Sequence, residues 1–79
     1  MLPTLKENAE YEIKRIKIDA ILVGDIIVFY INHTIICHRV IKKIVSLNGS
    51  LFFETKGDNC EQKDNFVVRD YMIIGKIEV

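Results

Sequence analysis

The chain has 79 residues, of which 49% are hydrophobic and 28% charged, so we expect one soluble globular domain over residues 1–79 rather than a disordered segment. Eleven Lys and Arg residues balance 11 Asp and Glu residues, and this zero net charge disfavours nucleic-acid binding as the main function. The two cysteines, Cys37 and Cys60, are too few for the disulfide framework of a small secreted domain. The longest apolar run, residues 26–31, is far too short for a membrane helix, which needs about 20 residues.

The first half of the chain predicts strands separated by tight turns. Residues 10–18 alternate apolar and charged side chains, and a break in phase predicts a bulge near Lys14–Arg15. A turn is expected around Gly24–Asp25. The apolar run 26–31 then predicts a strand buried on both faces, and a tight turn follows at Asn32–His33.

The second half continues in the same way. Residues 34–47 predict a long, bent strand, and Asn48–Gly49 is a strong signal for a two-residue hairpin turn. The remaining segments are, in order, a short strand at 51–55, a polar loop at 56–65, a turn or short helical turn at 66–71 and a final strand at 72–79. Together these elements predict an all-β fold, a small bent antiparallel sheet partly rolled into a barrel.

Four short segments carry the functional signal. They are Met1-Leu2-Pro3-Thr4; Gly24-Asp25 followed by His38-Arg39-Val40; Thr55-Lys56-Gly57-Asp58-Asn59-Cys60 with Asp64 six residues after Asp58; and Ile73-Ile74-Gly75-Lys76-Ile77. In this order they resemble type I signal peptidases along nearly the whole chain. His38 stands where a subgroup found in archaea, in the endoplasmic reticulum complex and in some spore-forming bacteria carries the catalytic His.

The resemblance implies the fold of the signal peptidase catalytic core and the cleavage of signal peptides from exported preproteins. The family's nucleophilic Ser would lie one residue before Met1, with a hydrophobic anchor ahead of it, and this chain is expected to be truncated relative to the family. Met1, Leu2 and Pro3 would contact the substrate, an extended peptide or preprotein. Neither a metal nor a cofactor is implied, contact with the membrane would come only through the anchor, and the family works at the outer or lumenal face of a membrane.

The implied chemistry needs a general base and a carboxylate that orients it. A Ser hydroxyl is a weak nucleophile until a base such as His38 takes its proton. A carboxylate then orients the imidazole and stabilises its charged form. The resemblance assigns Asp64 to this role and Asp58 to structural support or orientation, although the reverse assignment stays open. Cys60 replaces the second Asn of the family's usual Gly-Asp-Asn-Asn loop.

Other functions also stay open. A catalytically inactive, peptidase-like module would hold extended peptides without cutting them, and the residue before Met1 decides between the two. Self-cleaving repressor peptidases share the sheet, but they use Lys where His38 stands.

Two further alternatives involve the cysteines. A Cys–His hydrolase would need Cys60 to approach His38 through the loop, because Cys37 is the neighbour of His38 on a strand and neighbours point to opposite faces. A zinc site made of His33, Cys37, His38 and Cys60 lacks the paired ligand spacing of structural zinc sites.

Overall fold

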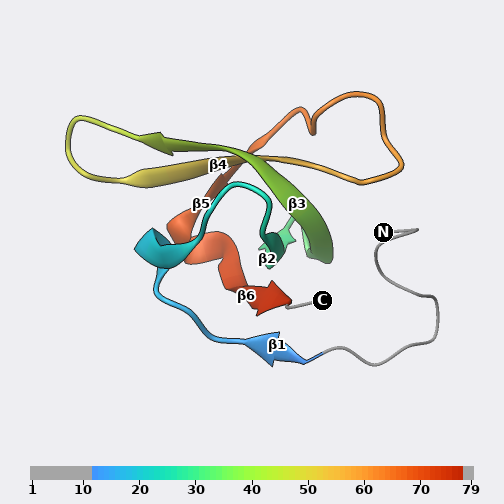
Figure 1. Ribbon diagram of the computed structural model, residues 1–79, viewed down its shortest axis with the longest axis horizontal. Helices are drawn as coiled ribbons and strands as arrows, with labels where there is room; N and C mark the ends of the chain where they lie inside the picture. The colour runs from blue at the N-terminus through green and yellow to red at the C-terminus, as the bar shows by residue number, and fades with distance from the viewer. Residues whose placement is uncertain (1–11, 78–79) are drawn as a thin grey trace.

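The computed structural model describes residues 12–77, which form one six-stranded antiparallel sheet (Figure 1). The strands are β1 (Ile13–Lys14), β2 (Ile26–Ile31), β3 (Thr34–Val45), β4 (Leu51–Lys56), β5 (Val67–Arg69) and β6 (Ile73–Ile77), with 3-10 helices η1 (Ile18–Ala20) and η2 (Asp70–Met72). Their spatial order is β1-β6-β2-β3-β4-β5. The predicted all-β class and bent antiparallel sheet are confirmed, but β1 and β5 remain separate edges, so the sheet is not closed into a barrel. Within residues 12–77 no helix is long and apolar enough to cross a bilayer.

The central strand β2 explains the continuous apolar run. It lies between β3 and β6, so both of its edges are paired, and residues 26–29 are buried. The turn that follows has positive φ angles of 51° at Asn32 and 62° at His33. Two successive residues in this region define the tight hairpin turn whose twist matches that of the strands. The buried strand and the two-residue turn are as predicted.

Strand β3 is long because its two halves have different partners. The first half pairs with β2, and the second half pairs with β4. The register with β4 shifts between Val40 and Lys42, which leaves Ile41 as an extra residue, and such a bulge bends a strand. The predicted bend is therefore present, although the strand ends at Val45 rather than Leu47.

The turn between β3 and β4 differs from the two-residue turn that we predict for Asn48–Gly49. The N–H of Ser46 donates to the carbonyl of Ser50 at 2.9 Å, so the loop has three residues. Only Gly49 within it has a positive φ, of 86°, whereas a two-residue turn of the predicted type needs two such residues. The Asn48 side chain is instead hydrogen-bonded to Ser46 Oγ and accepts the N–H of Ser50. These local bonds hold the turn in its longer form.

Two other predictions need correction. In the described part of residues 10–18 only Ile13–Lys14 forms a strand, and the predicted bulge at Lys14–Arg15 is not found. Strand β1 packs closely over Gly75, where a Cβ atom would lie 2.6 Å from the Lys14 carbonyl oxygen. At the other end, residues 66–71 contain the short strand β5 before the predicted helical turn, η2.

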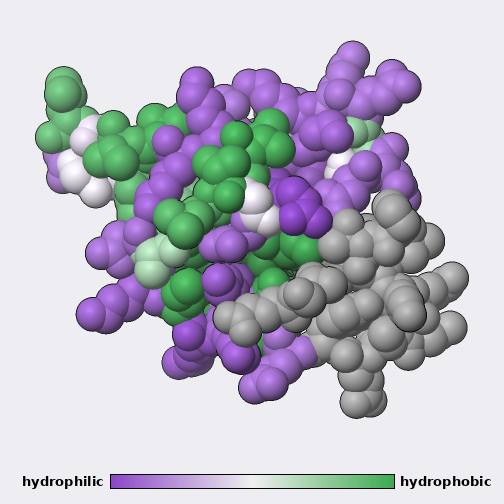
Figure 2. All heavy atoms as spheres, viewed as in Figure 1, coloured by the Kyte–Doolittle hydropathy of each residue, from purple (hydrophilic) through white to green (hydrophobic). Residues whose placement is uncertain are grey.

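The core lies on one face of the bent sheet. Its fully buried side chains come from β2, β3, β4, β5 and the segment after η1, and they are Ile27, Phe29, Val40, Phe53, Val68 and Ile21. Apolar side chains also reach the surface at the tip of the β3–β4 hairpin, where Leu47 is fully exposed (Figure 2). The polar loop 57–66 lies at the opposite end of these two strands (Figure 1).

Candidate active site

His38 lies in the first half of β3, opposite Ile27 of β2. Its ring meets the buried ring of Phe29 edge to face, with 6.4 Å between the ring centroids. The side chain nevertheless keeps 24% of its surface exposed. The imidazole is therefore supported by the core on one side and open to solvent on the other.

Asp64 reaches His38 from the end of the polar loop. Its Oδ2 atom lies 2.7 Å from Nδ1 of His38. The loop returns to the sheet at this point, because the N–H of Asp64 donates to the carbonyl of Thr55 at 2.8 Å. The pairing of His38 with Asp64 that the resemblance favours is present in the structure, while the catalytic role of the pair stays a prediction.

This contact fixes the chemistry of the two imidazole nitrogens. An ionised carboxylate can only accept hydrogen bonds, so Nδ1 of His38 carries the proton that is shared with Asp64. In the neutral ring the lone pair is then on Nε2. This is the tautomer that a general base needs if it is to take a proton from a nucleophile at Nε2.

Thr55 is a member of the site to which the sequence motif assigned no role. Its hydroxyl donates to the same Oδ2 atom of Asp64 at 2.6 Å, and its side chain is fully buried. A carboxylate held by two side-chain donors and its own backbone has little freedom to turn away from His38. The signal in the sequence was a Thr in an apolar strand just before the acidic loop, which is weak by itself.

Asp58, the other candidate acid, has a different partner. Its two carboxylate oxygens accept hydrogen bonds from Nε and Nη2 of Arg39, each at 3.0 Å. Arg39 also donates from Nη1 to the carbonyl of Gly24 at 2.7 Å. The hydrogen bonds with Asp58 raise the pKa of the Arg39 guanidinium above its ordinary value. Asp58 thus joins the loop to β3 and, through Arg39, to the turn before β2, and no hydrogen bond between Asp58 and His38 is found among the described residues.

The polar loop is therefore held to β3 on both faces. His38 and Arg39 are neighbours on a strand, so their side chains point to opposite faces and each takes one carboxylate of the loop. Between these contacts the loop is exposed, apart from the ion pair of Lys63 with Glu54 at 2.9 Å. The hydrogen bond from Lys63 lowers the pKa of Glu54.

Several other predicted residues do not join this site. Met1, Leu2 and Pro3 lie outside the described residues. His33 is in the β2–β3 turn, where its Nδ1 lies 3.3 Å from the Tyr30 hydroxyl. Among residues 12–77 no three His, Cys, Asp or Glu side chains form a group that could hold a metal ion.

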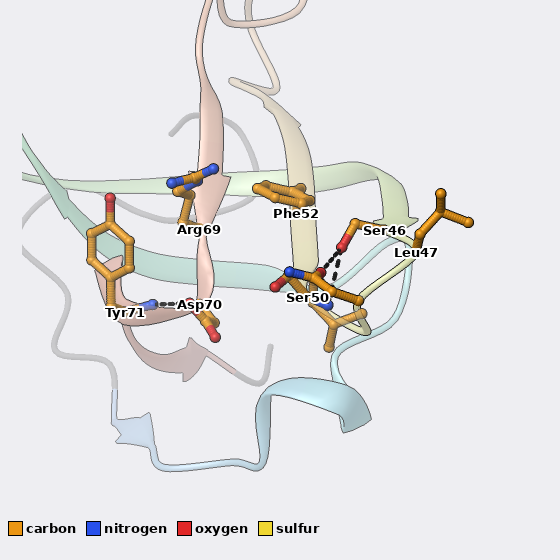
Figure 3. Close-up of a pocket in the computed structure, with 9 residues that line it drawn as sticks. Ser46, Leu47, Ser50, Phe52, Arg69, Asp70 and Tyr71 are labelled. Carbon is orange, nitrogen blue, oxygen red and sulfur yellow. Dashed lines mark hydrogen bonds between the residues drawn. The ribbon is translucent and has the colours of Figure 1, made fainter.

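An open hollow of about 770 Å³ lies away from His38, beside the β3–β4 turn (Figure 3). Two bonds link polar groups of its lining: Asp70 accepts the N–H of Tyr71 at 2.7 Å, and Ser46 bonds to Asn48. The Arg69 guanidinium stacks on Phe52 at 4.9 Å from the ring centroid. No set of nucleophile and base is found among the side chains that line it.

Comparison of the chain with models of protein families, with curated proteins and with solved structures finds no match. The geometry around His38 and the order of the sequence motifs are therefore the features of this chain that bear on its function.

Proposed function

We propose that this domain carries the general base, His38, and the orienting carboxylate, Asp64, of a serine endopeptidase of the signal peptidase type. The observation that carries the proposal is the 2.7 Å contact between Nδ1 of His38 and Oδ2 of Asp64. It occurs in a chain whose motifs follow the order of that family. The substrate would be an extended peptide, in the first place the signal peptide of an exported preprotein.

The chemistry would be acyl transfer. Nε2 of His38 takes the proton of a Ser hydroxyl placed directly before Met1, and the Ser oxygen attacks the peptide carbonyl. Asp64 stabilises the imidazolium, which then gives the proton to the leaving amine. Water then attacks the acyl ester while Nε2 of His38 takes its proton, and the proton passes to the Ser oxygen as the acyl–Ser bond breaks. Thr55 acts by holding Asp64 in place.

The sheet offers a place for an extended substrate. Within the described chain, residues 34–37 of β3 have a strand partner on the β2 side only, because pairing with β4 begins at Arg39. A peptide that adds to this edge by main-chain hydrogen bonds would pass next to His38. This edge supports a peptide as the partner in either reading, catalytic or purely binding.

The test compares two extended chains, one with Ser and one with Ala directly before Met1. The substrate is a fluorogenic peptide that contains a signal-peptide cleavage region with small side chains at the cut. We expect turnover only with Ser, and its loss on His38→Ala while the circular dichroism spectrum stays unchanged. Turnover that persists in His38→Ala would contradict the assigned role. Tight peptide binding without turnover in the Ser chain would favour the inactive binding module.

A further inference from the structure

The side chains of Cys60 and His38 both reach the space over Gly57. A Cβ atom placed on Gly57 would be 3.2 Å from Sγ of Cys60 and 3.2 Å from Nε2 of His38. The thiol and the imidazole nitrogen thus border the same methyl-sized space. This nitrogen is the one that Asp64 leaves as an acceptor, since Asp64 occupies Nδ1.

The position of Cys60 follows from the fold of the loop. The N–H of Cys60 donates to the carbonyl of Gly57 at 3.0 Å, which closes a tight turn over Gly57. The same loop is tied to β3 by Asp58 on one side of Cys60 and by Asp64 on the other. Cys60 is exposed, so small reagents can reach the thiol from solvent.

We propose that Cys60 is a thiol-modification site served by His38, and that small disulfides are its reagents. The Cys60 thiol gives its proton to Nε2 of His38, and its sulfur attacks one sulfur of the disulfide. A new S–S bond forms to Cys60, the reagent's S–S bond breaks, and the leaving thiolate takes up the proton. Cys60 is oxidised to a mixed disulfide while half of the reagent is reduced to a thiol.

The chain contains its own comparison thiol. Cys37 is next to His38 in sequence, but it points to the opposite face of β3 and is partly buried. Burial raises the pKa of the Cys37 thiol, which lowers its thiolate fraction. A generally reactive protein would modify both cysteines, whereas a His38-served site modifies Cys60 first.

The adduct has a consequence for the site. A group attached to Cys60 would lie over Nε2 of His38 and block its approach to any nucleophile. The thiol state of Cys60 would then control the peptidase. This consequence depends on the proposed function, whereas the reactivity of Cys60 does not.

The first experiment measures disulfide exchange on the wild-type chain with dithiodipyridine and with oxidised glutathione, and peptide mapping by mass spectrometry assigns each adduct. Cys37→Ser and Cys60→Ser variants give the rate of each thiol separately. We expect Cys60 to react about tenfold faster than Cys37, and His38→Gln to slow Cys60 about tenfold. Loss of folding in His38→Gln would instead speed the reaction of Cys37, so the two causes are distinguishable.

A second variant tests the shared space itself. Gly57→Ala places a methyl group in the space that the thiol and the imidazole both border, and it should slow Cys60 several-fold with His38 intact. A Cys60 rate that neither Gly57→Ala nor His38→Gln changes would overturn the proposal. Treating the Ser-extended chain with oxidised glutathione, then with a reductant, checks the link to peptide cleavage. If Gly57→Ala and His38→Gln slow the reaction of Cys60 in a chain that shows no peptidase activity, the proposed function fails while this inference holds.

Discussion

The Nδ1 atom of His38 lies 2.7 Å from the Oδ2 atom of Asp64, although 26 residues separate them in the chain. The contact exists because β4 and the polar loop return Asp64 to the edge of β3, where Thr55 holds it. Residues that are far apart in sequence are thus joined by a short network of side-chain hydrogen bonds. Each part of that network can be removed separately.

Asp64→Asn should remove most of the proposed peptidase activity in a Ser-extended chain. The amide can hold Nδ1 of His38 in the wrong tautomer, and in a comparable triad this substitution lowers the turnover rate about ten-thousandfold. Asp58→Asn is the matched control, because Asp58 bonds to Arg39 and not to the imidazole. Steady-state kinetics should show a large loss in kcat for Asp64→Asn and a much smaller one for Asp58→Asn. Equal losses would contradict the division of roles.

Thr55→Val should lower the free energy of unfolding by about 1 kcal/mol, because the buried hydroxyl donates to Asp64 and Val cannot. Urea denaturation measures the change. In an Asp64→Asn background the loss should shrink, since the bond to a carboxylate no longer exists. An undiminished loss in the double variant would show that Thr55 matters only for packing.

Arg39 and Asp58 should be energetically coupled. Their two parallel hydrogen bonds of 3.0 Å form a bidentate pair, with 34% of the Arg39 side chain and 14% of the Asp58 side chain exposed. Partial exposure to solvent weakens such a pair, so we expect a coupling free energy of about 1 kcal/mol. A double-mutant cycle with Arg39→Gln and Asp58→Asn measures it. Additive effects of the two substitutions would show that this pair does not stabilise the loop.

The ion pair of Glu54 with Lys63 should make stability depend on pH in the acid range. The hydrogen bond from Lys63 lowers the pKa of Glu54 in the folded chain, so folding favours the ionised carboxylate. The pair therefore stabilises the fold above the ordinary Glu pKa, and this contribution disappears as the pH falls through the lowered value. Thermal melts of the wild type and Glu54→Gln should differ at neutral pH and converge in acid. A constant difference across this range would show that ionisation of Glu54 is not the cause.

Much of the fold could be predicted from local patterns. The apolar run of β2 and the turn at Asn32–His33 follow directly from burial and backbone preference. The β3–β4 turn could not, because Asn48 uses its side chain to bond to Ser46 and Ser50 instead of adopting a positive φ. The close packing of β1 over Gly75 could not be predicted either, because the two segments are far apart in sequence.

The candidate site was predictable to a similar extent. Motif order singled out His38 and the two acidic residues, but it could not decide which acid meets the imidazole, because that depends on where the loop returns to the sheet. Thr55 and the nearness of Cys60 to Nε2 are products of tertiary packing. Such distances cannot be predicted from residue types alone.

The contacts of Asp64 and Asp58 with β3 also act on strand pairing. His38 and Arg39 present different chemistry to the two faces of β3, and each face meets its own carboxylate. A slip of β3 by one residue would exchange these faces, leaving a guanidinium where the imidazole belongs and the imidazole beside Asp58. The arrangement that assembles the candidate site therefore also penalises the misaligned sheet, so that correct alignment and a complete site arise together.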